Sequence, residues 1–259
     1  MIEIAICLAI IGFALVAIIG VLPLGMHTQR DTREETVINQ DATVLLEVVR
    51  GAARGADNLT NNVYAIANNW GYYNASGVMT ASGSNGFTYT GSTIPNNWPL
   101  NQSPLLLTNG VHIVGLMSVP EFMDGNGRPI VNLFNGGYSN HVTAYVRSIS
   151  GLAAEKPPQN NQIMQEDTFT YHVYCVNAPL ATDTNVFNLP LAQRLYATQL
   201  AASQHELRLT FLWPQLPNGS LPANPNRQTF RATVAGQLAQ DSTNNSLYFY
   251  QSQSFTNAP

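Results

Sequence analysis

The amino-acid sequence predicts an α+β protein, in which a long N-terminal α-helix, apolar in its first half and amphipathic in its second, packs on an antiparallel β-sheet domain with large loops. Residues 4–29 contain no Asp, Glu, Lys or Arg. Residues 27–71 carry apolar side chains at steps of three and four. Short segments rich in β-branched and aromatic residues follow. We therefore expect three parts: an apolar transmembrane or filament-core helix over 1–26, an amphipathic helix that continues it over 27–71, and a β-rich globular domain over 72–259.

The segment from Ile4 to Met26 is long and apolar enough to cross a membrane. As a helix with a rise of 1.5 Å per residue, it would be roughly 35 Å long. Three interpretations are open: a secretory signal peptide, a transmembrane anchor, or an anchor that later leaves the membrane and becomes the core of a filament. The first residues carry no positive charge and no A-x-A cleavage site closes the run, and both observations disfavour a signal peptide.

An amphipathic helix is predicted to continue directly from the apolar segment. Arg30 and Glu34 are spaced for an i,i+4 ion pair on its exposed side. No Gly-Pro break separates the apolar segment from the amphipathic segment, so we expect them to form one continuous helix. Beyond Asp57, a suitable N-cap, the same period continues to Trp70, and Gly71 provides a stop. The apolar face consists first of Ile38, Ala42, Leu45, Val49, Ala52 and Ala56.

The remaining chain is predicted to be rich in β-strands. Gly, Ser, Asn and Thr dominate residues 72–104, which predicts a long surface loop with a short hairpin near 87–90. A loop is predicted over 151–167 and a helix over 189–204. Strands are predicted from β-branched and aromatic content and turn-rich boundaries over 112–119, 129–134, 141–149, 168–176, 206–213, 228–238 and 246–253.

One acidic residue, Glu3, stands at the tip of the apolar segment, where an unpaired carboxylate is strongly disfavoured. The motif is IEIAICLAIIGFALVAIIG. A short apolar helix with one glutamate near its start, running into an amphipathic helix and then a β-rich domain, resembles a type IV pilin or a type II secretion pseudopilin. The resemblance covers only the N-terminal segment, residues 1–30.

The resemblance implies an assembly mechanism. In this family a leader peptidase cuts on the cytoplasmic side of the membrane and exposes a new amine, and the apolar helices of many subunits then bundle into a helical filament. Glu3 would pair with the N-terminal amine of a neighbouring subunit. A carboxylate in an apolar bundle is penalised unless it faces an ammonium group, and a wrong axial stagger leaves both charges unpaired. Glu3 is therefore expected to set the register.

The N-terminus departs from the family pattern. In the family the glutamate is usually fifth in the mature chain, which usually begins with phenylalanine, whereas here it is third, after Met1 and Ile2. We expect a leader and two further residues to precede this sequence. The other interpretation is that Met1 is the true start and processing differs, which would put the amine pairing of Glu3 in question.

Gly12 and Pro23 weaken the helix within the apolar segment. In a helix interior glycine costs about 1 kcal/mol and proline about 3 kcal/mol, and Pro23 also removes the hydrogen bond to the carbonyl of Ile19. Two interpretations are open. One is a simple kink, as in many membrane helices. The other, implied by the family resemblance, is that the stretch between the two residues unwinds when the subunit enters the filament.

The composition narrows the expected partners. Only 10% of the residues are charged, the formal net charge is −4, and Lys156 is the only lysine. Because phosphate binding requires clustered Lys and Arg, we expect no nucleic acid partner. Cys7 and Cys175 lie far apart and predict neither a disulfide framework nor a CxxC site. A sparsely charged, amide-rich surface suits a protein that packs closely against copies of itself or one that is exposed outside the cell.

No motif for catalysis or nucleotide binding is present: P-loop, GxGxxG, HExxH and GxSxG sequences are all absent. In DGNGRP, Asp124 and Asn126 are weak calcium candidates, but the other ligands are missing and a hairpin turn explains the motif. His141 and His172 lie in separate predicted strands and could meet in a sheet, although isolated strand histidines are usually structural. A glycosidase requires two carboxylates at a fixed distance from each other. Four carboxylates could supply such a pair, but the sequence does not define their distances: Glu121, Asp124, Glu166 and Asp167.

The sequence therefore predicts a non-catalytic structural subunit of a pilus- or pseudopilus-like helical filament, with calcium as the only, weakly supported, cofactor. The assembly residues are Glu3, Met1, Gly12 and Pro23. Expected partners are copies of itself, the pilus or type II secretion machinery and, before assembly, the inner membrane. The C-terminal domain would be exported before assembly, and after assembly it would belong to a periplasmic or extracellular filament. The alternatives are a membrane-tethered exported enzyme or carbohydrate-binding protein that does not polymerise, and a periplasmic scaffold of a secretion machine.

Overall fold

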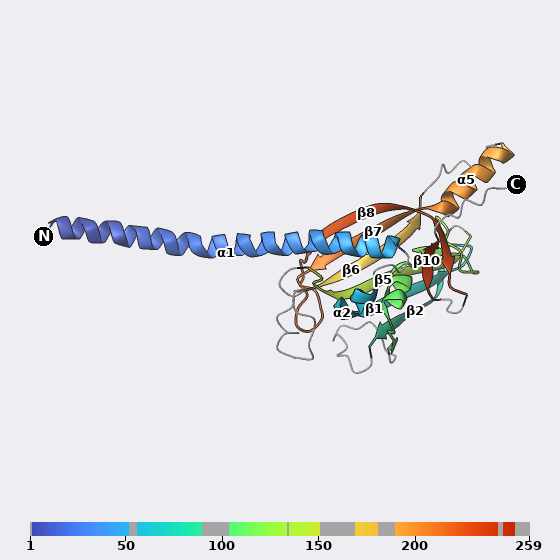
Figure 1. Cartoon of the computed structure of the whole chain (residues 1–259), viewed down its shortest axis with the longest axis horizontal. Coiled ribbons are helices and arrows are strands. Elements are labelled where there is room, and N and C mark those ends of the chain that lie inside the picture. The colour runs from blue at the N-terminus through green and yellow to red at the C-terminus, as the bar shows by residue number, and fades with distance from the viewer. Residues whose placement is uncertain are drawn as a thin grey trace. The chain divides into compact units, whose positions relative to one another are not determined.

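The computed structural model confirms the predicted α+β class (Figure 1). The chain forms two compact units, Met1–Gln40 and Asp41–Pro259. The first unit is helical, and the second contains the sheet together with the last turns of the N-terminal helix. The residues that the structure describes are 2–51, 56–89, 104–133, 135–150, 169–180, 190–242 and 246–251.

Helix α1 runs from Ile2 to Arg50 without a break, as predicted for the joined apolar and amphipathic segments. The predicted i,i+4 pair is formed, with Arg30 Nε 2.8 Å from Glu34 Oε1. The hydroxyls of Thr32 and Thr36 each donate a hydrogen bond to the carbonyl one turn earlier, at 2.8 Å. The polar side chains of this part of α1 are therefore partly satisfied within the helix itself.

In the described part of the second unit, eight strands form one sheet with the order β3-β2-β1-β5-β6-β7-β8 and with β4 beside β5. Its pairs are antiparallel except for β2 with β3. A second, two-stranded sheet pairs β9 with β10. Within the described residues the strands are β1 Val63–Tyr73, β2 Met79–Thr88, β3 Leu105–Leu106, β4 Phe122–Met123, β5 Gly137–Arg147, β6 Thr170–Pro179, β7 Gln204–Trp213, β8 Asn226–Ala235, β9 Gln237–Gln240 and β10 Tyr248–Gln251.

Several predicted elements of the second unit are confirmed. The helix predicted over 189–204 is α5, Leu191–Ser203. Gly236, with a φ of 151°, follows the end of β8, and β9 begins at the next residue. This φ favours glycine, so Gly236 divides the single strand predicted here into two. The confirmed strand predictions are 141–149, 168–176, 206–213, 228–238 and 246–253, which match β5, β6, β7, β8 with β9, and β10.

The helix predicted over 57–71 is wrong. After a 3₁₀ turn at Ala56–Asn58 and the single turn of α2, Leu59–Asn62, the chain enters strand β1 at Val63. β1 pairs with β2 on one side and with β5 on the other, so the sheet satisfies its backbone polar groups on both sides. The helical spacing of the apolar residues is overridden by this pairing, which the aromatic and β-branched content of β1 also favours.

The surface loop predicted over 72–104 is also wrong over Met79–Thr88, which forms β2. A tight turn joins β1 to β2, because the Asn74 side-chain oxygen accepts hydrogen bonds from the amides of Ser76 and Val78 at 2.9 and 3.0 Å. The result is a hairpin much longer than the one predicted near 87–90. Residues 90–103 and the loop predicted over 151–167 lie outside the described residues.

The strand predicted over 112–119 is wrong, because residues 110–117 form helix α3, Gly110–Met117. Asn109 caps α3, because its side-chain oxygen accepts a hydrogen bond from the His112 amide at 2.8 Å. Nearly every residue of α3 is buried, and a short run that is apolar all round has no period to separate helix from strand. The strand predicted over 129–134 is also wrong, because the described residues 129–133 contain only an isolated bridge.

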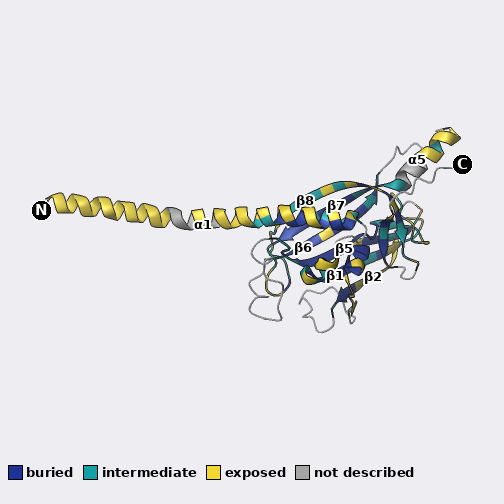
Figure 2. Ribbon diagram, in the orientation of Figure 1, coloured by how far each residue is buried: buried dark blue, intermediate teal, exposed yellow. Residues whose placement is uncertain are grey.

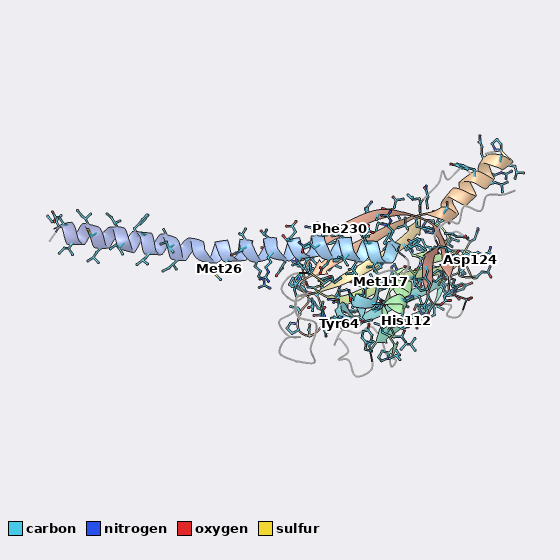
Figure 3. All side chains as sticks on the ribbon, viewed as in Figure 1. Met26, Tyr64, His112, Met117, Asp124 and Phe230 are labelled. Carbon is cyan, nitrogen blue, oxygen red and sulfur yellow. The ribbon has the colours of Figure 1, made fainter. Side chains whose placement is uncertain are left out.

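The core of the second unit lies on the face of the sheet that α3 covers. α3 packs against β1, β5 and β10, and Figure 3 labels His112 and Met117 on it. The last turns of α1 contribute further buried side chains, and the buried residues concentrate on the central strands (Figure 2). Alternate residues of β6 and β7 face the core. The buried residues of this core include Ala42, Leu45, Val49, Ile113, Met117, Tyr171, Val173, Leu207, Leu209 and Phe211.

Candidate assembly site

The apolar part of α1 exposes its side chains on all sides. The stretch Ile2–Gly20 has a mean hydropathy of 2.9 and is 0% buried (Figure 2). This helix is long and apolar enough to cross a membrane, and it could act as a membrane anchor or a signal sequence. The large apolar residues of this stretch that are more than half exposed are Ile2, Ile4, Ile6, Leu8, Ile10, Ile11, Phe13, Leu15, Val16, Ile18 and Ile19.

Glu3 lies in the first turn of α1 and is exposed, whereas Met1 lies outside the described residues. A carboxylate is favoured there by the helix dipole, which contributes about 0.3–1 kcal/mol. That contribution is small compared with the several kcal/mol that a lone carboxylate loses in apolar surroundings. In a membrane or a helix bundle, the helix end alone therefore does not compensate Glu3.

Helix α1 continues through both Gly12 and Pro23. A Cβ atom built at Gly12 meets no other atom within 4 Å, so no contact within the chain requires glycine at this position. A missing side chain on a membrane helix lets a neighbouring helix approach closely. The unwinding between Gly12 and Pro23 that the family resemblance implies stays a prediction about the assembled state.

Sequence reasoning missed a buried carboxylate, Asp41, which fixes the last turns of α1 to the sheet. Asp41 Oδ2 accepts hydrogen bonds from the Ile149 amide at 2.9 Å and from the Tyr171 hydroxyl at 2.7 Å. Its Oδ1 accepts from the Ser150 amide at 2.7 Å and from the Ser150 hydroxyl at 2.5 Å. Asp41 is 0% exposed. We call these four residues the Asp41 clamp.

The Asp41 clamp has a recognisable signal in the sequence. Asp41 precedes Ala42 and lies four residues before Leu45, on the face of the helix that the apolar periodicity marks as buried. An acidic residue on such a face requires hydrogen-bond donors from the domain it packs on. Burial raises the pKa of Asp41 above its ordinary value, and the donors from Ser150, Ile149 and Tyr171 oppose that shift.

The DGNGRP segment forms a turn. Asp124 Oδ1 accepts hydrogen bonds from the amides of Asn126 at 2.8 Å and Arg128 at 2.9 Å, and Gly127 has a φ of 78°. Tyr248 closes the turn by donating its hydroxyl to the Gly127 carbonyl at 2.9 Å. One of the two carboxylate oxygens of Asp124 therefore holds the turn, as the hairpin-turn interpretation of this motif predicts. The described residues contain no group of three or more His, Cys, Asp or Glu side chains placed to hold a metal ion.

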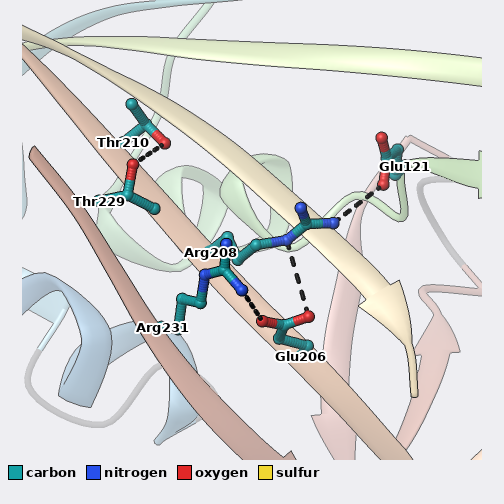
Figure 4. A network of polar contacts seen from close by, with 6 residues as sticks. All are labelled: Glu121, Glu206, Arg208, Thr210, Thr229 and Arg231. Atoms are coloured by element: carbon teal, nitrogen blue, oxygen red, sulfur yellow. Dashed lines mark hydrogen bonds and ion pairs between the residues drawn. The ribbon is translucent and has the colours of Figure 1, made fainter. Parts of the chain in front are cut away.

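The carboxylate of Glu121 takes part in an ion-pair network on β7 and β8 (Figure 4). Arg208 and Arg231 lie directly opposite each other in the two strands, an arrangement that like charges disfavour. Glu206 lies 3.8 Å from Arg208 and 3.6 Å from Arg231, and Glu121 lies 3.6 Å from Arg208. The two acidic side chains thus compensate the two arginines. Glu166 and Asp167, the other glycosidase candidates, lie outside the described residues.

The sheet does not bring His141 and His172 together. His172 lies opposite Tyr145 in the register of β5 with β6, whereas His141 lies opposite Asn69 of β1. His172 Nε2 donates a hydrogen bond to the Gly219 carbonyl at 3.1 Å, and its ring centroid is 4.5 Å from that of Tyr145. His172 therefore has a structural role between the sheet and the segment around Gly219.

The stability of the second unit is expected to fall at mildly acidic pH because of His172. Burial lowers the pKa of His172 from 6.5 to about 4, while its hydrogen bond to Gly219 opposes the shift. Between these values the unfolded chain binds the proton and the folded chain does not, so stability is present above pH 6.5 and is lost as the pH falls towards 4. The expected loss is roughly 2–3 kcal/mol, measured by urea unfolding of the full chain in detergent.

His172→Gln provides the control for this pH dependence. Glutamine can still donate a hydrogen bond to the Gly219 carbonyl, but it does not titrate. The difference in unfolding free energy between the original chain and His172→Gln is expected to shrink as the pH falls. A difference that stays constant from neutral pH to about pH 4 would contradict the assignment.

Comparisons with known proteins give no match: no family model, no curated protein and no solved structure is significantly similar to this chain.

Proposed function

We propose that this chain is a structural subunit of a pilin-like helical filament and that it polymerises through the apolar part of α1. The observation that carries the proposal is the unbroken helix α1, whose stretch Ile2–Gly20 is apolar, 0% buried and charged only at Glu3. A permanent membrane anchor requires the apolar length, but it gives no reason for a carboxylate near the tip.

In the proposed assembly, the apolar helices of several copies replace the lipid around one another. Packing between such helices relies on van der Waals contact and on small residues that allow close approach, and the open space around Gly12 supports a contact of this kind. Glu3 pairs with the N-terminal amine of a neighbouring copy. Because other axial staggers leave both charges unpaired in an apolar bundle, this pair sets the register.

The Asp41 clamp supports the second part of the proposal, in which every polymerised helix carries a sheet domain. The clamp fixes the last turns of α1 to β6 through Tyr171 and to the segment after β5 through Ile149 and Ser150. We propose that the sheet domain forms the outer shell of the filament. Before assembly the chain would lie in the inner membrane with this domain exported, and the pilus or type II secretion machinery would extract it.

Electron microscopy of material sheared from the native host tests the proposal. We expect helical fibres that contain this chain, and mass spectrometry of the fibre subunit would show which residue carries the amine that pairs with Glu3. An anchored protein that does not polymerise would instead stay in the membrane fraction, and a signal sequence would be absent from the mature chain. Either of these results would contradict the proposed function.

A further inference from the structure

Strands β1, β2 and β5 lie side by side in the sheet (Figure 1). A pocket of about 380 Å³ opens on these three strands. We call it the hairpin pocket. It lies wholly within the second unit. Ser139 and Gly71 are buried, whereas Ser82 and His141 are exposed. The volume falls within the usual range for small-molecule sites, near its lower end.

The hairpin pocket is lined by polar side chains that the fold itself does not engage. Among the residues that the structure describes, four that line the pocket make no hydrogen bond or ion pair with their side chains: Asn69, Ser82, Ser139 and His141. Elsewhere in the second unit, side chains such as Asn74, Asn109 and Asn140 hold turns, a helix cap and a backbone carbonyl. An amide, two hydroxyls and an imidazole that face one pocket without partners are available to a ligand.

An apolar surface lies beside these polar groups. A Cβ atom built at Gly71 would lie 3.3 Å from Tyr73 Cε2 and 3.2 Å from Met79 Sδ. The missing side chain at Gly71 therefore lets an aromatic ring edge and a thioether lie close to the strand. Both residues line the pocket, which thus combines an aromatic and thioether surface with hydrogen-bonding groups.

Among the residues that the structure describes, the lining has no Asp, Glu, Lys or Arg side chain. A phosphate, a carboxylate or an ammonium ligand would find no countercharge here, so the binding of ions is disfavoured. The unengaged Asn, Ser and His groups can both donate and accept hydrogen bonds. Sugar hydroxyls require this combination, and the carbon-bound hydrogens of a sugar ring pack on an aromatic surface.

We propose that the hairpin pocket binds an uncharged saccharide. Asn69 and His141 hydrogen-bond its hydroxyls, Ser82 and Ser139 bind further hydroxyls, and Tyr73 and Met79 contact its apolar ring surface. This inference is independent of the proposed filament, because all of these residues lie in the second unit.

The test uses the full chain in a sugar-free zwitterionic detergent, because a maltoside detergent would compete for the site. Glucose, galactose, N-acetylglucosamine and lactose are the probes, and binding is followed by saturation-transfer NMR and titration. We expect at least one of these sugars to bind with a millimolar Kd. Galacturonic acid and glucosamine, which carry a charge, are expected to bind at least tenfold more weakly or not at all.

Variants locate the binding site. Asn69→Ala and His141→Ala are each expected to weaken binding by about tenfold, since each removes hydrogen bonds to the sugar. Ser82→Tyr, at an exposed position, is expected to block the pocket without disturbing the core. The matched control is Asn85→Ala, an exposed residue of β2 outside the pocket lining, and it should bind as the original chain does. Circular dichroism confirms that each variant is folded.

Three results would overturn the proposal. One is that none of the neutral sugars binds at any attainable concentration. Another is that a neutral sugar binds but folded Asn69→Ala, His141→Ala and Ser82→Tyr chains bind it equally well. The third is that only the charged sugars bind. None of these results depends on whether the chain forms fibres.

Discussion

A chain with the substitution Glu3→Ala is expected to fold and to enter the membrane, but to form few or no filaments. The substitution leaves the N-terminal amine of each neighbouring copy without a countercharge in the apolar bundle, which costs several kcal/mol at every contact. Because a filament repeats this contact in each copy, the loss accumulates along the polymer. The measurement is the amount of sheared fibre per cell, compared with the amount of chain in the membrane.

A second substitution at Glu3 distinguishes the effect of its charge from that of its size, and a substitution elsewhere in α1 serves as the control. Glu3→Gln keeps the length of the side chain and removes only its charge, so it is expected to fail as Glu3→Ala does. The matched control is Glu35→Ala, which removes an exposed acidic residue from the same helix outside the apolar stretch and should leave fibre yield unchanged. If Glu3→Ala and Glu3→Gln both give normal fibres, charge pairing by Glu3 does not set the register.

The second large effect is expected at Asp41. Asp41→Asn offers only one acceptor oxygen, and its amide nitrogen would face donors of the clamp, such as the Ile149 amide. Leaving buried donors unsatisfied is expected to lower the free energy of unfolding by about 3–4 kcal/mol. Urea unfolding of the full chain in detergent, followed by the near-ultraviolet signal of the sheet domain, measures the change.

The control for Asp41 is Asp57→Asn, at an exposed position of the same unit, where we expect a change of less than about 0.5 kcal/mol. Tyr171→Phe removes one donor from the clamp and keeps the buried ring, so about 1 kcal/mol should be lost. If Asp41→Asn is no less stable than Asp57→Asn, the clamp does not hold the helix to the sheet. In that case apolar packing of Ala42, Leu45 and Val49 alone would account for the attachment.

The parts of the fold that could be predicted from the sequence are those with a long or uniform pattern. Helix α1 has 49 residues and a clear apolar period in its second half, and no Gly-Pro break separates its two halves. Strands β5, β6 and β7 are recognisable because β-branched and aromatic residues fill them and turn residues bound them. In these segments local preference and tertiary structure agree, so one sequence pattern is enough.

The elements that sequence reasoning missed depend on distant contacts. Strand β1 has apolar residues at helical spacing as well as aromatic and β-branched residues, and its pairing with β2 and β5 decides for a strand. Helix α3 is buried on nearly all sides and therefore shows no helical period, and its N-cap Asn109 is the one local sign of a helix start.

The candidate sites differ in how far the sequence could find them. The apolar helix and the position of Glu3 at its tip follow directly from the sequence, whereas the assembly role of Glu3 is what the family resemblance implies. The role of Asp41 could be predicted only from the presence of an acidic residue on a buried helical face. Its partners Ser150 and Tyr171 could not be predicted, since they are more than 100 residues away in the sequence. The hairpin pocket could not be predicted, because it depends on the pairing of β1 with both β2 and β5, and that pairing was not expected.

The central claim is that the apolar helices of different copies pack on one another and that Glu3 is neutralised across that contact. A reconstruction by electron microscopy of the sheared fibres tests it most directly. The account predicts a core of bundled helices formed by Ile2–Gly20, with each Glu3 carboxylate beside the N-terminal amine of the adjacent copy. Fibres held together by the sheet domains, with no helical core or with Glu3 far from any amine, would contradict it.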